Sequence, residues 1–360
     1  MHLCFSITAH GFGHGAISCS VINRLMQHYP DIKISVLTLL DKRYLNARLV
    51  GKFNYYHVGS DFGMLMHSAI DIDVESSQRK YQQLFDNWQQ HVDYEKQLLS
   101  KINPDILISN ISPITLDAAQ QLNIRTASVA PFNWAQIYQA YCLDDSYKTQ
   151  SIYQKMNTIY QAVDQVFKPI PHVPLGDGNE INIASINDLP AGDLTKLLGK
   201  LPRNTKRIGL IALGGLPFPL DLQNWYQEEG LQWLVDDVVP ISRTDISQIS
   251  SLNIPFLQLL ACCDLIITKP GYGTYCEIAS IAKHKKIRVM SLVRPDWPET
   301  VYLNQFLSER VPFIELEKIQ LLGDALYHAI KQVDRIDYPD VDRCEDGAMQ
   351  LVELLMAKVP

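Results

Sequence analysis

Residues 263–282 read CDLIITKPGYGTYCEIASIA, and this stretch decides the fold. An apolar run at 265–268 predicts a buried strand, which passes through a glycine-rich loop into a helix. Such a unit builds a parallel α/β sheet, and ligands bind at the carboxyl ends of its strands. The loop N–H groups, the helix dipole and Lys269 could bind a diphosphate, and Glu277 could accept hydrogen bonds from a ribose. The alternative is a plain turn whose glycines only allow tight geometry.

The same order of elements recurs along the whole chain. Short apolar runs alternate with helical patterns in both halves, including one long helical segment at about 74–101. This alternation predicts parallel sheets that are covered by helices on both faces. A stretch rich in Pro, Gly, Asn and Asp separates the halves. We expect a Rossmann-like amino-terminal domain at 1–170, a linker region at 171–204, a carboxyl-terminal domain at 205–345 and a final helix at 346–360.

The composition excludes several classes of function. The chain has 360 residues, of which 47% are hydrophobic, so it can bury two cores. Its formal charge of -7 argues against a nucleic-acid partner, which needs a clustered basic surface. No apolar run approaches the roughly 18 residues of a membrane span, so we expect no integral membrane segment. The seven cysteines are scattered, which is typical of free thiols in a reducing compartment, and we expect a cytoplasmic protein.

A second glycine-rich loop follows the first predicted strand. Residues 8–18 read TAHGFGHGAIS. The spacing of Gly11, Gly13 and Ala16 fits a dinucleotide fingerprint, and Asp41 could supply the acidic residue that binds a ribose. This interpretation favours an NAD- or FAD-dependent oxidoreductase, but it gives the loop at 269–274 no role. His10 and His14 indicate a different chemistry, because an imidazole titrates near neutral pH and can accept a proton from a hydroxyl.

The segment LLACCDLIITKPGYGTYCEIASIA, followed by a strand and by RPDWPETVYLNQFLSE, resembles the donor-binding region of GT-B glycosyltransferases, most closely the glycosyltransferase-like domain of L-arabinokinases. The resemblance implies a GT-B fold, with two Rossmann-like domains whose parallel sheets face each other across a cleft. It implies that Glu277, six residues after Gly271, binds the ribose of a nucleotide-sugar donor, and that this donor is a UDP-sugar. Plant members of the family have a histidine where this chain has Lys269. The donor-binding residues that we expect are Gly13, Gly214, Gly215, Lys269, Gly271, Tyr272, Gly273, Thr274, Glu277, Arg294, Asp296 and Glu299.

The resemblance also implies a reaction. His14, with His10 as the second choice, would take the proton of an acceptor hydroxyl in an inverting transfer that needs no metal and no cofactor. The acceptor stays open: a small molecule, a glycan or a lipid-linked compound. The alternatives are a non-catalytic nucleotide-sugar-binding protein and a nucleotide-sugar 2-epimerase. Two weaker signals are the DID sequence at 71–73, which imitates a metal-binding motif, and Phe132 to Trp134, which would line the acceptor side.

Overall fold

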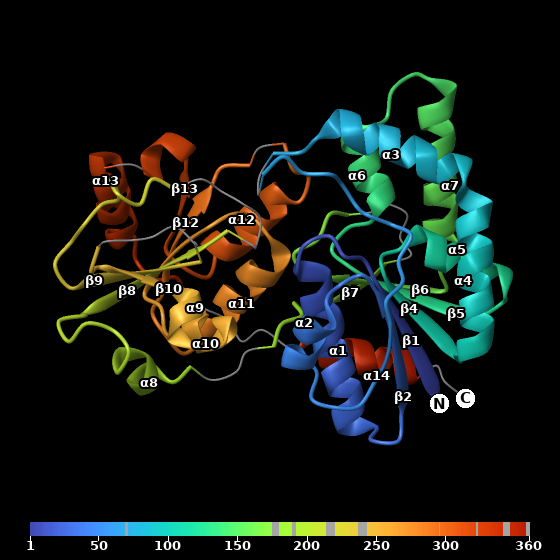
Figure 1. Cartoon of the computed structure of the whole chain (residues 1–360), viewed down its shortest axis with the longest axis horizontal. Helices are drawn as coiled ribbons and strands as arrows, with labels where there is room; N and C mark the ends of the chain where they lie inside the picture. Colours follow the sequence, from blue (N-terminus) through green and yellow to red (C-terminus); the bar gives the residue numbers. More distant parts are fainter. Residues whose placement is uncertain are drawn as a thin grey trace. The chain divides into compact units, whose positions relative to one another are not determined.

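The computed structural model describes residues 1–68, 71–174, 180–188, 192–213, 220–236, 243–294, 296–321, 323–340 and 346–357. Within these ranges the chain forms two compact units. The first unit takes in the described residues of 1–67, 71–187 and 345–360, and the second takes in those of 68–70 and 188–344. Each unit is built around its own parallel sheet (Figure 1).

The sheet of the first unit has seven strands in the order β3-β2-β1-β4-β5-β6-β7. Every neighbouring pair is parallel, which agrees with the alternation of strands and helices in the sequence. The strands are β1 (His2–Ile7), β2 (Lys33–Thr38), β3 (Asn54–Tyr56), β4 (Ile106–Asn110), β5 (Arg125–Val129), β6 (Gln165–Pro169) and β7 (Glu180–Ile183). All residues of β1 and β4 are buried, as expected for central strands with helices on both faces.

Helices cover both faces of this sheet, with α4, α5 and α7 on one side and α1 and α14 on the other (Figure 1). The helices of the first unit are α1 (Gly13–His28), α2 (Lys42–Arg48), α3 (Val74–Asp86), α4 (Trp88–Ile102), α5 (Pro113–Gln121), α6 (Trp134–Tyr141), α7 (Tyr147–Gln161) and α14 (Gly347–Met356). The helical segment expected over 74–101 is divided into α3 and α4 at Asn87. The Asn87 side chain donates a hydrogen bond to the carbonyl of Gln83 at 2.9 Å, so a side-chain amide bonds to the helix backbone at this junction.

Helix α14 brings the end of the chain back to the first unit. Arg24 of α1 forms an ion pair with Asp346 at 2.7 Å. The Gln350 side chain accepts a hydrogen bond from the backbone N–H of Ala184, just after β7. A Cβ atom at Gly347 would lie 1.9 Å from the carbonyl oxygen of Ala184, so only glycine permits this approach. The range 171–204, expected as a linker, therefore includes β7, an edge strand of the first sheet, and α8 (Leu194–Leu198) of the second unit.

The second unit has a six-stranded parallel sheet in the order β10-β9-β8-β11-β12-β13. Its strands are β8 (Arg207–Ala212), β9 (Leu231–Val235), β10 (Ile246–Gln248), β11 (Leu265–Thr268), β12 (Arg288–Leu292) and β13 (Phe313–Leu316). Besides α8, its helices are α9 (Ile249–Leu252), α10 (Phe256–Leu260), α11 (Tyr272–Ala282), α12 (Thr300–Ser308), the 3-10 helix η1 (Lys318–Leu321) and α13 (Gly323–Asp334). A core that includes Trp233, Ile267 and Leu326 lies between this sheet and the helices.

Candidate functional site

The first candidate site lies where β1 and β4 end side by side. Ile7 is paired with Asn110 in the parallel register, so the loops that follow the two strands meet at the same edge of the sheet. The glycine loop turns through Gly11, whose φ of +67° favours glycine, and α1 begins at Gly13. This turn places His14 in the first helical turn, where its side chain is buried.

Asn110 holds the His14 imidazole in one orientation. Nδ1 of His14 lies 2.7 Å from Oδ1 of Asn110. The Asn110 amide nitrogen donates to the backbone oxygen of His14 at 3.1 Å and to the Ser18 hydroxyl at 3.2 Å. A carbonyl oxygen can only accept, so the amide nitrogen must point toward it and Oδ1 must face the ring. Nδ1 of the neutral imidazole therefore carries the proton, and Nε2 keeps a lone pair that can accept one.

Burial decides the charge of this histidine. Only 5% of His14 is exposed. Burial lowers the pKa of His14 to about 4, and the hydrogen bond with Asn110 opposes this shift only in part. His14 is therefore neutral at pH 7. The sequence indicated an imidazole that titrates near neutral pH, but in the structure the pKa of His14 is about 4 instead of the ordinary 6.5.

Aromatic side chains surround the two histidines. The His14 ring lies 5.7 Å from Phe132 and 5.6 Å from Trp134, and the His10 ring lies 5.2 Å from Trp134, between ring centroids. Gly63 has a φ of +68°, and a Cβ atom there would lie 2.6 Å from Trp134 and 2.8 Å from His10. The loop before Gly63 therefore packs directly on this cluster. The Phe132–Trp134 segment, noted in the sequence, thus borders both candidate bases.

Two polar residues beside these rings were missed by sequence reasoning. Asn110 ends a buried strand at the edge where His14 was expected, and that position was the only signal for it. Asp61 is buried, accepts a hydrogen bond from the Thr8 hydroxyl, and has its pKa raised by burial. The indole N–H of Trp134 donates to the same hydroxyl at 3.3 Å. Asp61 lies in a loop without a recognisable pattern, so no local motif marks it.

The second candidate site lies at the start of α11 in the second unit. Gly271 is the N-cap residue of α11, and no side chain caps the helix there. A Cβ atom at Gly271 would meet only the Lys269 carbonyl oxygen, at 3.9 Å. A Cβ atom at this position would thus meet no close contact among the described residues. Tyr272, Gly273 and Thr274 form the first turn, where the backbone N–H groups of a helix point toward its N-terminal end. Glu277 lies in the next turn with 4% of its surface exposed.

Two basic residues follow the neighbouring strands β11 and β12. Burial and the charge of Arg294 lower the pKa of Lys269 to about 8, and Glu299 opposes this shift. Arg294 is 5% exposed, and its guanidinium carbon lies 4.1 Å from the centre of the Trp297 ring. The Trp297 N–H donates to Glu299 at 3.2 Å. The structure thus brings Lys269, Arg294 and Glu299 together beside a helix N-terminus.

The remaining predicted residues have different positions. Glu299 is buried and Asp296 is exposed, so the two acidic residues of RPDWPE lie in different environments. Gly214 and Gly215 lie outside the described residues, two and three positions beyond the end of β8. Asp41, the acid of the dinucleotide interpretation, caps α2 by accepting from the Arg43 N–H at 2.6 Å. Asp73 of the DID sequence caps α3 in the same way, through the N–H of Ser76.

Two other kinds of site are absent from the described part of the chain. No group of three or more His, Cys, Asp or Glu side chains there could hold a metal ion. None of the helices in those ranges is long and apolar enough to cross a membrane.

Comparisons with solved structures settle the architecture. The glycosyltransferase of kitacinnamycin superposes with a TM-score of 0.66 at 11% identity, over 100% of this chain and 99% of that chain. Arabidopsis thaliana UGT89C1, solved with quercetin, gives 0.62 at 11% identity, over 99% and 98%. The chain has the GT-B fold. A putative UDP-N-acetylglucosamine 2-epimerase from Listeria monocytogenes is also similar, with a TM-score of 0.57 at 12% identity, over 99% and 96%.

Sequence comparison gives a weak relationship. No protein-family profile matches the chain. An L-arabinokinase from Arabidopsis thaliana is 22% identical over 336 residues, which is 89% of this chain and 31% of that protein. The chain thus spans about a third of the length of this relative. The match agrees with the resemblance that the motifs at 263–282 and 294–309 indicated.

Proposed function

We propose that this GT-B protein is a glycosyltransferase that moves a sugar from a nucleoside-diphosphate donor, most simply a UDP-sugar, to an acceptor hydroxyl. The observation that carries the proposal is the His14–Asn110 pair. It fixes the protonated nitrogen of a buried imidazole and leaves Nε2 as an acceptor, which is what a general base requires. A protein that only binds nucleotide sugars has no need of an oriented base.

The second unit would bind the donor. The N–H groups at the start of α11 and the positive charges of Lys269 and Arg294 suit a diphosphate. Glu277, one turn further along the same helix, would accept hydrogen bonds from the ribose hydroxyls. Glu299 and Asp296 would contact the donor sugar. The fold shared with Arabidopsis thaliana UGT89C1 and with the glycosyltransferase of kitacinnamycin supports a donor site in the second unit.

The first unit would activate the acceptor. The acceptor oxygen bonds to the anomeric carbon from the face opposite the diphosphate, and the bond between that carbon and the diphosphate oxygen breaks, which inverts the configuration. Because burial disfavours the imidazolium ion, Nε2 of His14 would take the proton only as the new bond forms and the hydroxyl becomes acidic. Lys269, Arg294 and the helix amides would stabilise the charge of the departing diphosphate, so no metal ion is needed in this scheme.

The buried state of the cysteines supports a cytoplasmic location. Six free cysteines are buried in the part of the chain that the structure describes. Such thiols persist in a reducing compartment. We therefore propose that the enzyme acts in the cytoplasm, on a small-molecule, glycan or lipid-linked acceptor.

A donor screen with the full chain tests this proposal. Nucleotide sugars are incubated with acceptor mixtures, and release of the nucleoside diphosphate is measured for the wild type, His14→Ala and His10→Ala. We expect His14→Ala to lower turnover about 10²- to 10⁴-fold with unchanged UDP affinity, and His10→Ala to do less. Donor binding without turnover in every mixture would favour a binding protein instead. Conversion of UDP-N-acetylglucosamine without an acceptor would favour an epimerase.

A further inference from the structure

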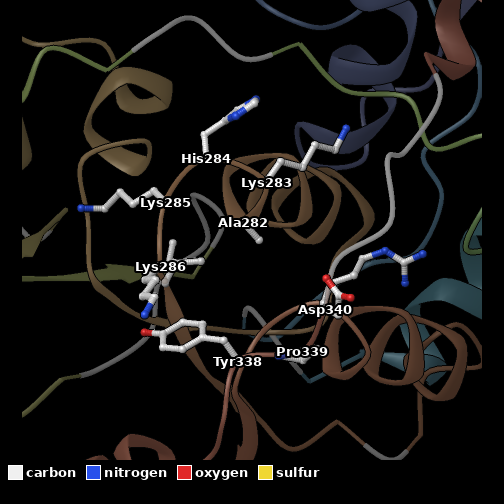
Figure 2. Close-up of a pocket in the computed structure, with 10 residues that line it drawn as sticks. Ala282, Lys283, His284, Lys285, Lys286, Tyr338, Pro339 and Asp340 are labelled. Carbon is white, nitrogen blue, oxygen red and sulfur yellow. The ribbon is translucent and has the colours of Figure 1, made fainter.

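The cavity drawn in Figure 2 lies in the second unit, and the protein's own groups balance part of its basic lining. Its volume is about 670 Å³. Lys285 forms an ion pair with Asp264 at 2.7 Å, and Arg310 forms one with Glu309 at 3.4 Å. The lining segments follow the carboxyl ends of α11, α12 and α13, where the helix dipole disfavours an anion. We assign no ligand to this cavity.

A buried carboxylate in the first unit has no role in the proposed reaction. Asp61 is 8% exposed and lies between β3 and α3. Every residue of the segment 60–63 contacts a partner from elsewhere in the unit. The contacts are Ser60 with Glu95, Asp61 with Thr8, Phe62 with Tyr81, and Gly63 with Trp134 and His10. The segment is therefore held along its whole length, and Asp61 has a fixed position.

The hydrogen of the Thr8 hydroxyl points at Asp61. A hydroxyl group donates one hydrogen bond and accepts two. The Thr8 oxygen accepts from the indole N–H of Trp134 at 3.3 Å and from the backbone N–H of Ile111 at 3.3 Å. Its one hydrogen is left for Asp61, whose Oδ2 accepts it. The hydroxyl is thus fully used, and without the carboxylate its hydrogen would lose this acceptor.

The surroundings of Asp61 require a group that only accepts hydrogen bonds. Burial raises the pKa of Asp61, and hydrogen bonds from the side chains of Thr8, Ser112 and Trp134 oppose this shift. An ionised carboxylate has acceptors alone, whereas an asparagine amide would bring two N–H donors to the same place. Among the described residues, no basic side chain forms an ion pair with Asp61. The carboxylate is therefore held by hydrogen bonds from neutral groups.

Thr8 also supports the two groups that surround His14. Its N–H donates to the carbonyl oxygen of Asn110 at 2.8 Å, and its hydroxyl accepts from the next N–H along the chain, that of Ile111. Thr8 thus holds the peptide group that follows Asn110, whose side chain bonds to Nδ1 of His14. The same hydroxyl holds the Trp134 indole, whose ring centre lies 5.6 Å from that of His14. A displaced Thr8 hydroxyl should therefore move the imidazole.

A simpler account is that Asp61 only supports the fold. Asp117 of α5 is a carboxylate of that kind: it accepts from the Trp88 indole N–H at 2.6 Å, and Lys155 balances its charge at 3.0 Å. Asp61 has no such cation among the described residues, and its partner Thr8 contacts the groups around the candidate base. A role in support of the fold alone does not explain this difference.

We propose that Asp61 is a positioning residue for the histidine that activates the acceptor. Acting through the Thr8 hydroxyl, its carboxylate holds Asn110 and Trp134 around the His14 imidazole. The proposal rests on the proposed function, in which His14 is the general base. A displacement of about 1 Å in an active site can lower a rate about 10²-fold, so we expect the network to act on kcat.

Kinetics of the full chain test the proposal, with a donor and an acceptor found in the donor screen. We expect Asp61→Asn and Thr8→Val to lower kcat about 10- to 100-fold, with the KM values and the UDP affinity within about twofold of the wild type. Thr8→Ser keeps the hydroxyl and should have the wild-type kcat. Asp117→Asn is the matched control, because it alters a buried carboxylate–indole pair on α5, and it should leave kcat unchanged.

NMR signals of the His14 ring and of the Trp134 indole N–H report the position of these groups without any substrate. Both signals should shift in Asp61→Asn and Thr8→Val and keep their wild-type values in Asp117→Asn. The signals belong to the folded state, so a loss of stability alone would not move them. Valine is nearly the same size as threonine, so Thr8→Val tests the network even where Asp61→Asn does not fold.

Three results would overturn the proposal. Asp61→Asn could have the same kcat as Asp117→Asn, which would make the role of Asp61 structural. The KM of the acceptor could rise in Asp61→Asn at unchanged kcat, which would make Asp61 an acceptor-binding residue. The His14 ring signals could be the same in wild type and Asp61→Asn, which would show that Asp61 does not position the ring. If no nucleotide sugar is turned over, the proposed function fails, whereas these ring signals still decide whether Asp61 positions His14.

Discussion

The Asn110 side chain, at the end of β4, accepts a hydrogen bond from Nδ1 of His14, in the first turn of α1, at 2.7 Å. Residues that are 96 positions apart in the chain thus determine one tautomer of one imidazole. The neutral amide does so without supplying a charge, and burial keeps the pKa of His14 at about 4. The contact with Asn110 sets the orientation of the candidate base, whereas burial sets its low basicity.

Replacing Asn110 by Asp should change the pH dependence of the reaction. A carboxylate in place of the amide favours the imidazolium ion, so the pKa of His14 should rise from about 4. The acid limb of the rate profile should move to higher pH in Asn110→Asp, and nitrogen chemical shifts of the ring should report the same change without any substrate. Ser18→Ala, which removes only the other side-chain partner of the Asn110 amide, is the control. Identical ring titrations in wild type and Asn110→Asp would contradict the tautomer assignment.

Glu95 should make the protein less stable as pH rises. This glutamate of α4 is 1% exposed, its Oε1 accepts from the Ser60 hydroxyl at 2.7 Å, and its Oε2 has no partner. Burial raises the pKa of Glu95 to about 7, above the ordinary value of 4.5. Between these pH values the folded state keeps a proton that the unfolded state has released, so the free energy of unfolding falls as pH rises. Across this pH range the free energy of unfolding falls by about 3 kcal/mol.

Glu95→Gln removes this titration. Its stability relative to the wild type should increase between about pH 4.5 and 7, measured by urea unfolding at several pH values. The comparison cancels the opposite contribution of His14, whose lowered pKa makes both proteins less stable as pH falls from 6.5 toward 4. Glu353→Gln, at an exposed glutamate of α14 in the same unit, is the matched control. A pH-independent difference between Glu95→Gln and wild type would show that Glu95 ionises normally.

The sequence predicted the layout of the fold because its signals are local. Buried β-branched runs such as 265–268 and the glycine turn after them are encoded within a few residues, and the structure has β11 and α11 there. The same holds for β1, β4 and β5. Small edge strands carry little apolar pattern, and this is why β7 was taken as part of a linker.

The site was predicted only where a motif marks it. His14 and Lys269 lie in glycine loops that are visible in the sequence, whereas Asn110 and Asp61 reach their positions through strand register and loop packing. The low pKa of His14 is a property of burial among Phe132 and Trp134, and no local pattern encodes burial at a strand end. Contacts between distant segments therefore account for what the sequence left out.

Removing the Glu277 carboxylate should weaken UDP binding, because the ribose hydroxyls lose their hydrogen-bond acceptor. Loss of a charge-assisted contact costs about 1.5–3 kcal/mol, so UDP affinity should fall about 10- to 150-fold in Glu277→Ala. A ligand without ribose hydroxyls separates this role from a structural one: the affinity for 2′,3′-dideoxy-UDP should be nearly the same in wild type and Glu277→Ala. Both affinities are measured by calorimetry with the full chain. Equal losses for the two ligands would mean that buried Glu277 supports the fold of α11 instead.

The last prediction concerns Lys269, whose pKa is lowered to about 8 chiefly by burial and then by the charge of Arg294. A bound diphosphate favours the protonated amine, so binding should raise this pKa and take up a proton in weakly alkaline solution. UDP affinity should therefore fall about tenfold per pH unit above pH 8. Lys269→Arg keeps its charge throughout this range, so its UDP affinity should vary much less with pH.

Calorimetry in two buffers of different ionisation enthalpy at about pH 8.5 measures the proton uptake directly, and it separates Lys269 from groups elsewhere in the chain. Proton uptake should be present in the wild type and largely absent in Lys269→Arg, whereas Lys196→Arg, at an exposed lysine of the same unit, should behave as the wild type does. If wild type and Lys269→Arg take up the same number of protons, the amine does not contact the diphosphate. The charge at the start of α11 would then have to come from Arg294 and the helix amides alone.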